Sequence, residues 1–193
     1  TASGNLANVT VTDTNDFEIQ AVTLSGNLDV ISTGGSITDD GALAITGTSS
    51  FTTSASNEDI TLDTTTNAFT GAVILSTTGS TGNAEIDGGT TQLDIAASTV
   101  GGNLKLTSGN ATGITDSGTV TVSGNLTVVN DVSNGDINMD SLAVDGTIAL
   151  ATIGSGGNVT LVNDAGLDFA ASTIGGDLNA TATTLNISDS GTL

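Results

Sequence analysis

The chain has 193 residues, and its single basic residue, Lys105, stands against 21 acidic ones, which gives a formal net charge of −20. Nucleic-acid binding depends on cationic contacts to phosphate, and anionic membrane surfaces attract basic segments, so this charge excludes both as partners. Proline, cysteine, histidine, tryptophan and tyrosine are absent, whereas 26 residues are glycine and four are phenylalanine. A hydrophobic share of 36% and a mean hydropathy of +0.21 still provide a core of small aliphatic side chains.

Short strands with alternating apolar and polar residues are predicted along the whole chain, most of them after Gly-Asn, Gly-Asp or a similar polar start. In chain order they are GNLDV (26–30), GALAI (41–45), EDITL (58–62), NAEID (83–87), GNLKL (102–106), GTVTV (118–122), GDINM (135–139), GNVTL (157–161) and GDLNA (176–180). Helical periodicity is missing, and the β-branched residues disfavour helix. The chain is therefore all-β.

The alternation predicts which side chains face the core. The inward set is Leu43, Ile45, Leu104, Leu106, Val120, Val122, Ile137 and Met139, and the outward set is Ala42, Ala44, Thr119 and Thr121. The four phenylalanines, Phe17, Phe51, Phe69 and Phe169, are expected in wider corners of the core. Glycine and asparagine are expected at corners that need a positive φ.

The sequence also contains a long internal duplication. The segment AASTVGGNLKL (96–106) returns as AASTIGGDLNA (170–180), at an offset of 74. SITDDGALAITG (36–47) corresponds to GITDSGTVTVSG (113–124), and NEDITLD (57–63) to NGDINMD (134–140), both at an offset of 77. Residues 1–193 thus form one segment with about two and a half copies of a unit of about 75 residues.

Strands this short need neighbours on both sides, which stacked coils supply. The steps between Leu104, Val120, Ile137, Val159 and Leu178 average about 18.5 residues, so four coils make one unit. The prediction is a single parallel β-helix solenoid of about ten coils, right-handed by the usual crossover preference and about 45–50 Å long. Duplicated residues are expected on the same side, four coils apart.

The runs SITDDGALAITG, GITDSGTVTVSGNLTV (113–128) and STIGGDLNATATTLNISDSGTL (172–193) resemble the repeats of filamentous-haemagglutinin-like adhesins, which are secreted bacterial β-helical proteins of the two-partner secretion type. The resemblance covers essentially the whole chain. It implies an extracellular or cell-surface repeat shaft that projects binding regions or forms a fibre. The expected partners are neighbouring repeats, copies of the chain stacked end to end, or a cell-surface receptor. The Asn-Pro-Asn motif of the family's secretion domain is absent, because the chain has no proline.

The chain has few residue types that act as a general base or nucleophile, so it is predicted not to be an enzyme and to need no cofactor. Histidine and cysteine are absent, which excludes Ser-His-Asp and Cys-His arrangements. Two carboxylates can hydrolyse glycosides, and Asp39/Asp40 and Asp59/Asp63 are close in sequence, but such pairs are usually solvated turn residues. No catalytic, cofactor-binding or metal-binding residue is therefore predicted.

Two alternatives to the shaft stay open. Calcium needs only oxygen ligands, which the segments TNDFE (14–18), NEDITLD and SNGDINMD (133–140) supply. Ice binding needs a regular threonine row in every coil. Thr10/Thr12 and Thr119/Thr121 have the spacing, but Ala42 and Ala44 occupy the positions that match Thr119 and Thr121 one unit earlier, so the row is expected to fail there.

The two ends of the sequence read like ordinary repeat. TASGNLANVT lacks the features of a signal peptide, and the final SDSGTL stops where the earlier copy continues. The chain is therefore expected to belong to a longer array. End-to-end stacking is expected to strengthen with salt, because salt screens the repulsion between acidic chains.

Overall fold

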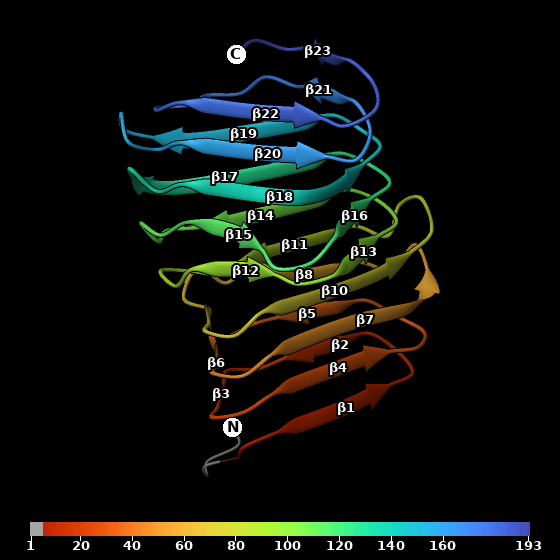
Figure 1. Ribbon diagram of the computed structural model, residues 1–193. Coiled ribbons are helices and arrows are strands. Elements are labelled where there is room, and N and C mark those ends of the chain that lie inside the picture. Colours follow the sequence, from red (N-terminus) through yellow and green to blue (C-terminus); the bar gives the residue numbers. More distant parts are fainter. Residues whose placement is uncertain (1–5) are drawn as a thin grey trace.

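The computed structural model describes residues 6–193, which form 23 β-strands and no helix. The strands wind into one parallel β-solenoid of about eight turns, with the first and last turns at opposite ends of the rod (Figure 1). This confirms the predicted fold class.

Three sheets make up the sides of the solenoid. The nine-stranded sheet contains β2 (Phe17–Ile19), β5 (Ile37–Asp39), β8 (Ile60–Leu62), β11 (Ala84–Asp87), β14 (Leu104–Ser108), β17 (Leu126–Ser133), β19 (Ile148–Ile153), β21 (Leu167–Phe169) and β23 (Ile187–Asp189). The three-stranded sheet contains β3 (Val22–Leu24), β6 (Leu43–Ile45) and β9 (Ala68–Phe69).

The eleven-stranded sheet holds the remaining strands. They are β1 (Val9–Asp13), β4 (Leu28–Ser32), β7 (Ser49–Ser56), β10 (Val73–Thr78), β12 (Leu93–Ile95), β13 (Ser98–Val100), β15 (Ile114–Asp116), β16 (Val120–Val122), β18 (Ile137–Val144), β20 (Val159–Asn163) and β22 (Leu178–Ala182).

The register of the nine-stranded sheet gives the length of a turn. Eight steps lead from Phe17 to Asp189, so one turn takes about 21.5 residues on average. The sequence predicted a shorter turn, because the strand starts behind that prediction lie on two different sheets: Leu104 belongs to the nine-stranded sheet, and Val120, Ile137, Val159 and Leu178 belong to the eleven-stranded sheet. The rod is therefore also shorter than predicted, at about 38 Å for eight steps of about 4.8 Å.

The core follows the predicted alternation. All eight residues predicted to point inward are at most 1% exposed, and the four predicted to point outward are half-buried or exposed. Phe51, Phe69 and Phe169 are buried, and Phe17 is half-buried against the core in the first turn. The rings of Phe51 and Phe69 meet edge to face with centroids 6.2 Å apart. The interior is a continuous aliphatic column with a few aromatic rings.

The duplicated residues do not lie on the same side, so that prediction is wrong. Three turns along the nine-stranded sheet lead from Leu104 to Phe169, whereas the duplicate of Leu104 is Leu178, nine residues further on and in the eleven-stranded sheet. Ile60 and its duplicate Ile137 are likewise in different sheets. At about 21.5 residues a turn, the unit of about 75 residues spans about three and a half turns instead of four, because a sequence repeat need not be a whole number of turns.

Candidate functional site

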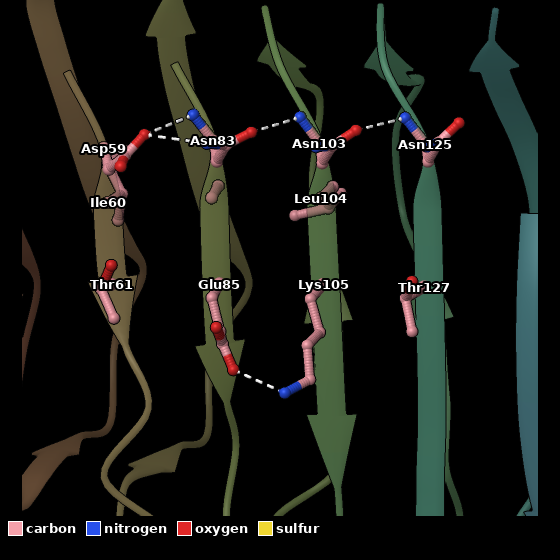
Figure 2. A pocket seen from close by; sticks show the side chains of 11 residues that line it. Asp59, Ile60, Thr61, Asn83, Glu85, Asn103, Leu104, Lys105, Asn125 and Thr127 are labelled. Carbon is pink, nitrogen blue, oxygen red and sulfur yellow. Dashed lines mark hydrogen bonds and ion pairs between the residues drawn. The ribbon is translucent and has the colours of Figure 1, made fainter. Parts of the chain in front are cut away.

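A row of polar side chains runs along the corner where the strands of the nine-stranded sheet begin (Figure 2). The Oδ1 atom of Asp59 accepts the backbone N–H of Asn83 at 2.7 Å, and Oδ1 of Asn83 accepts that of Asn103 at 2.9 Å. Asn103 accepts from Asn125 at 2.8 Å, and Asn125 from Thr147 at 2.9 Å. Each bond joins one turn to the next, so the row is a ladder parallel to the solenoid axis.

The ladder extends further and has counterparts in the eleven-stranded sheet. In earlier turns, Asp16 accepts from the N–H of Ser36, and Ser36 Oγ from that of Asp59, both at 3.0 Å. The other two ladders are Asn8–Asn27–Thr48 and Asp136–Asn158–Asp177. In all three, the side chain belongs to the earlier turn and the N–H to the later turn. The ladders therefore have a direction.

The glycine that precedes many ladder residues is required by close approach of two turns. An added Cβ at Gly124 lies 2.5 Å from Asn103 Oδ1 and 2.6 Å from the carbonyl oxygen of Gly102. A Cβ added at Gly102 or at Gly146 would likewise clash with the asparagine Oδ1 and the glycine carbonyl of the preceding turn. The prediction that glycine and asparagine occupy the corners with a positive φ is confirmed, although the ladder glycines are not among those residues. Among the described residues, positive φ is confined to Asn57, Asn134, Gly79, Gly89, Gly113 and Gly154.

The duplicated AAST segment also joins two turns. The hydroxyl of Ser98 accepts the N–H of Leu75 at 3.0 Å and donates to the carbonyl of Ala96 at 2.8 Å. Its duplicate Ser172 accepts from Leu150 at 3.0 Å and donates to the carbonyl two residues earlier at 2.9 Å. The same local bonds thus recur at both copies of the segment, on different sides of the solenoid.

Lys105 lies in a shallow depression on the outer face of the nine-stranded sheet (Figure 2). Its Nζ donates to Glu85 Oε1 at 2.7 Å, and this hydrogen bond raises the pKa of Lys105. The side chains are 48% and 36% exposed. The rest of the lining is amide, hydroxyl and aliphatic side chains, with Asp59 held in the ladder. Nothing in this depression pairs a nucleophile with a base.

One member of each carboxylate pair considered for glycoside hydrolysis, Asp39 and Asp59, makes a structural contact. Asn67 Nδ2 donates to Asp39 Oδ2 at 2.7 Å. Burial raises the pKa of Asp39 above its ordinary value of 3.8, and the hydrogen bond from Asn67 reduces that effect. Asp59 accepts from Asn83, as described above. The contacts of Asp39 and Asp59 therefore link turns of the solenoid.

The segments considered for calcium also contribute to the ladders. Asp16, Asp59 and Asp136, one from each segment, accept a backbone N–H of the following turn. Across residues 6–193, no three acidic side chains converge closely enough to hold a metal ion. The same residues contain no helix that is long and apolar enough to cross a bilayer.

The positions compared above for a threonine row lie on different sides of the solenoid. Ala44 lies in the three-stranded sheet and Thr121 in the eleven-stranded sheet. The row that contains Thr121 is Thr12, Ile31, Thr52, Ser76, Thr99, Thr121 and Ala143. The residues of this row are uncharged over seven turns, but their side chains alternate among threonine, isoleucine, serine and alanine. In the neighbouring row, Thr10 pairs with the charged Asp29 of the next turn. The side lacks the regular paired threonines that ice binding requires.

Taken together, the parallel turns, the aliphatic core and the ladders define a repeat β-solenoid. The model of a family described as repeats of unknown function matches residues 6–76, 81–152 and 156–193. Because these matches cover nearly the whole chain, the chain belongs to this family of repeats. None of the curated proteins or solved structures compared with the chain matches it.

The sequence indicated turns at the Gly-Asn starts but did not reveal their bonding. The signal was the recurrence of Asn or Asp directly before an apolar residue at steps of about one turn, as at Asn83, Asn103 and Asn125. A partner 20 to 22 residues away became evident only once the register was known.

Proposed function

We propose that the chain is a non-enzymatic structural shaft of a secreted bacterial adhesin or extracellular fibre. The observation that carries this proposal is the ladder from Asp16 to Thr147, which joins seven consecutive turns through side-chain bonds in addition to the strand pairing. Each turn also adds buried aliphatic side chains, worth about 1.5–3 kcal/mol apiece on transfer. Such a column resists bending and separation of its turns.

Two further points support the proposal. Asp39 accepts a hydrogen bond from the side chain of Asn67 and Asp59 accepts one from the backbone N–H of Asn83, so both carboxylates link neighbouring turns and already have a structural role. Membership of a repeat family also fits a module that gains length by adding copies. The adhesin role, the surface location and secretion rest on the resemblance of the repeats to filamentous-haemagglutinin-like proteins.

The shaft is tested by small-angle scattering of the purified chain, which should give a rod about 38 Å long. A glycosidase or lyase assay with a clear turnover would overturn the proposal, as would a compact spherical scattering profile. For location, antibodies against the chain should label intact producing cells, and labelling only after permeabilisation would contradict the surface role. Calcium titration and ice-growth assays should show no effect.

A further inference from the structure

Two corners of the solenoid are duplicates of each other and lie on different sheets. One follows β7 of the eleven-stranded sheet at Asn57, and the other follows β17 of the nine-stranded sheet at Asn134. Both asparagines are exposed, and both have a positive φ, of 69° and 62°. Asparagine adopts this conformation more readily than most residues, so each corner favours it.

Each asparagine also binds the next turn. Asn134 donates its backbone N–H to the carbonyl of Ile153 at 2.6 Å, and its Oδ1 accepts the N–H of Gly156 at 2.9 Å. Asn57 makes the two equivalent bonds at its own corner. The two corners therefore hold their asparagines in the same way.

The corners differ in the residue that follows the asparagine, which is Glu58 in the first and Gly135 in the second. A Cβ added at Gly135 would lie 2.5 Å from both Cγ and Nδ2 of Asn130. Asn130 is fully buried, and its Nδ2 donates to two carbonyls, so its side chain is held in place. The first corner has the smaller Thr53 at the matching position and accommodates the Cβ of Glu58. Packing against Asn130 therefore requires the glycine.

The result is an exposed asparagine followed directly by glycine, and Asn134-Gly135 is the one Asn-Gly pair in the sequence. Glycine has no Cβ to keep its nitrogen away from the side-chain Cγ of the preceding residue. The N–H of Gly135 donates to the Val132 carbonyl at 3.3 Å, which is longer than an ordinary hydrogen bond, so this nitrogen is loosely held. Within residues 6–193, Nδ2 of Asn134 donates no hydrogen bond, so its departure breaks no contact.

We infer that Asn134 is a site of self-modification, at which the chain converts this asparagine to aspartate and isoaspartate without an enzyme. The nitrogen of Gly135 bonds to Cγ of Asn134, the Cγ–Nδ2 bond breaks, and ammonia leaves with the proton that the Gly135 N–H gives up. The product is a five-membered succinimide. The N–H of Gly156 stabilises the negative charge that develops on Oδ1 during the attack.

Water then opens the succinimide at one of its two carbonyl carbons. Opening at Cγ gives aspartate, and opening at the main-chain carbonyl gives isoaspartate, so the whole reaction consumes one water and releases one ammonia. In isoaspartate the main chain runs through Cβ and Cγ of residue 134 and is one atom longer. The corner has no slack for this atom, since a Cβ added at Gly154 of the next turn would lie 2.7 Å from Asn134 Oδ1. The reaction therefore loosens the contact between the turns of β17 and β19.

The first experiment compares the two asparagines within one chain. The purified chain is incubated at neutral pH in water labelled with heavy oxygen, which marks conversion that occurs before sample preparation, and its peptides are followed by mass spectrometry. Asn134 should convert at least about tenfold faster than Asn57, a difference of about 1.4 kcal/mol in the activation barrier. The products should include isoaspartate, because the succinimide opens at both carbonyls. Equal rates, or aspartate as the sole product, would refute the inference.

Exchanging the residues of the two corners tests the structural cause. Glu58→Gly gives the first corner the glycine of the second, and Asn57 should then convert at least about tenfold faster than in the unchanged chain. Asn130→Thr with Gly135→Glu gives the second corner the residues of the first, and Asn134 should convert at least about tenfold more slowly. Asn130→Thr alone is the control. It keeps the glycine, so the rate at Asn134 should stay unchanged.

Hydrogen exchange tests the consequence for the fold. In the isoaspartate form, the amide of Gly156 should exchange at least about tenfold faster than before conversion, whereas the amide of Thr81 at the duplicate corner should not change. Unchanged exchange at Gly156 would refute the loosening of this contact, and a Glu58→Gly variant without faster conversion of Asn57 would refute the role of the glycine. Reaction at Asn134 is independent of the proposed shaft function, which is tested by the shape of the unmodified chain.

Discussion

Gly124→Ala tests whether the ladder glycines are required by close approach of two turns. The added methyl group lies 2.5 Å from Asn103 Oδ1, 2.6 Å from the carbonyl oxygen of Gly102 and 2.8 Å from its carbonyl carbon. Two of these atoms are backbone of the preceding turn, so a side-chain rotation cannot relieve the clash. The two turns must separate locally by about 1 Å to restore ordinary contact distances.

The separation weakens two hydrogen bonds at the same point. Gly124 donates to the Gly102 carbonyl at 2.9 Å, and Asn125 donates to Asn103 Oδ1 at 2.8 Å. Each bond contributes about 1 kcal/mol, and overpacking costs about 1–3 kcal/mol more. Alanine also reduces the conformational entropy of the unfolded chain, which offsets about 0.4–1 kcal/mol of this loss. The free energy of unfolding should therefore fall by about 2–4 kcal/mol, which lowers the melting temperature by about 5–15 °C if the chain melts cooperatively.

The assay is thermal unfolding followed by circular dichroism, with Gly109→Ala as the control. A Cβ at Gly109 meets only the flexible carboxylate of Asp131 at 3.0 Å and the Gly89 carbonyl oxygen at 3.3 Å, and its φ is not positive. The control should change the melting temperature by less than about 3 °C. If Gly124→Ala has the same melting temperature as the unchanged chain, or if both variants lose the same stability, the ladder glycines are not required by close approach.

Three further predictions concern the core, the charge and the ion pair. Val120→Asp places an unpaired carboxylate at a fully buried position and should lower the free energy of unfolding, measured with urea, by at least about 3 kcal/mol. The outward Thr121→Asp should lower it by less than about 0.5 kcal/mol. The reverse order would contradict the assignment of inward and outward positions. Burial raises the pKa values of Asp39, Asp87 and Asp116 in the folded state, so the folded state binds protons more tightly than the unfolded state. The urea midpoint should therefore rise as pH falls from ~7 to ~5, and a falling midpoint would contradict this. Because Lys105 and Glu85 are well exposed, Lys105→Met should change stability by less than about 0.5 kcal/mol, and a loss above about 1 kcal/mol would show that the pair is structurally important.

The fold class was predictable because the information is local. Alternation of apolar and polar residues sets which side chains of a strand face the core, so the inward positions of Leu104 and Val120 followed from their neighbours alone. The absence of helical periodicity and the internal duplication then left stacked coils as the way to bury one apolar face in every strand. The lack of histidine and cysteine restricted the chemistry that any site could perform.

The number of turns was less accessible, because a turn is closed by pairing between residues far apart in the sequence. Corner loops vary in length without changing the strands, so ladder partners in successive turns are separated by 19 to 24 residues. The sequence shows where strands begin but does not show on which sheet each one lies. Counting Leu104 and Val120 as successive turns therefore gave a period that was too short, since these residues begin strands of different sheets in the same turn.

By itself, the sequence determined that this is an all-β repeat with an aliphatic interior and an acidic exterior, because those properties follow from residue type and spacing. Only the tertiary structure decided that the repeated unit spans about three and a half turns, so that duplicated residues such as Leu104 and Leu178 lie on different sheets. It also decided that Asn103 binds Asn83 and Asn125, which are turn residues in the sequence and ladder partners in the solenoid. The physical reason is that register between turns depends on the total length of every strand and corner in a coil, which no local pattern fixes.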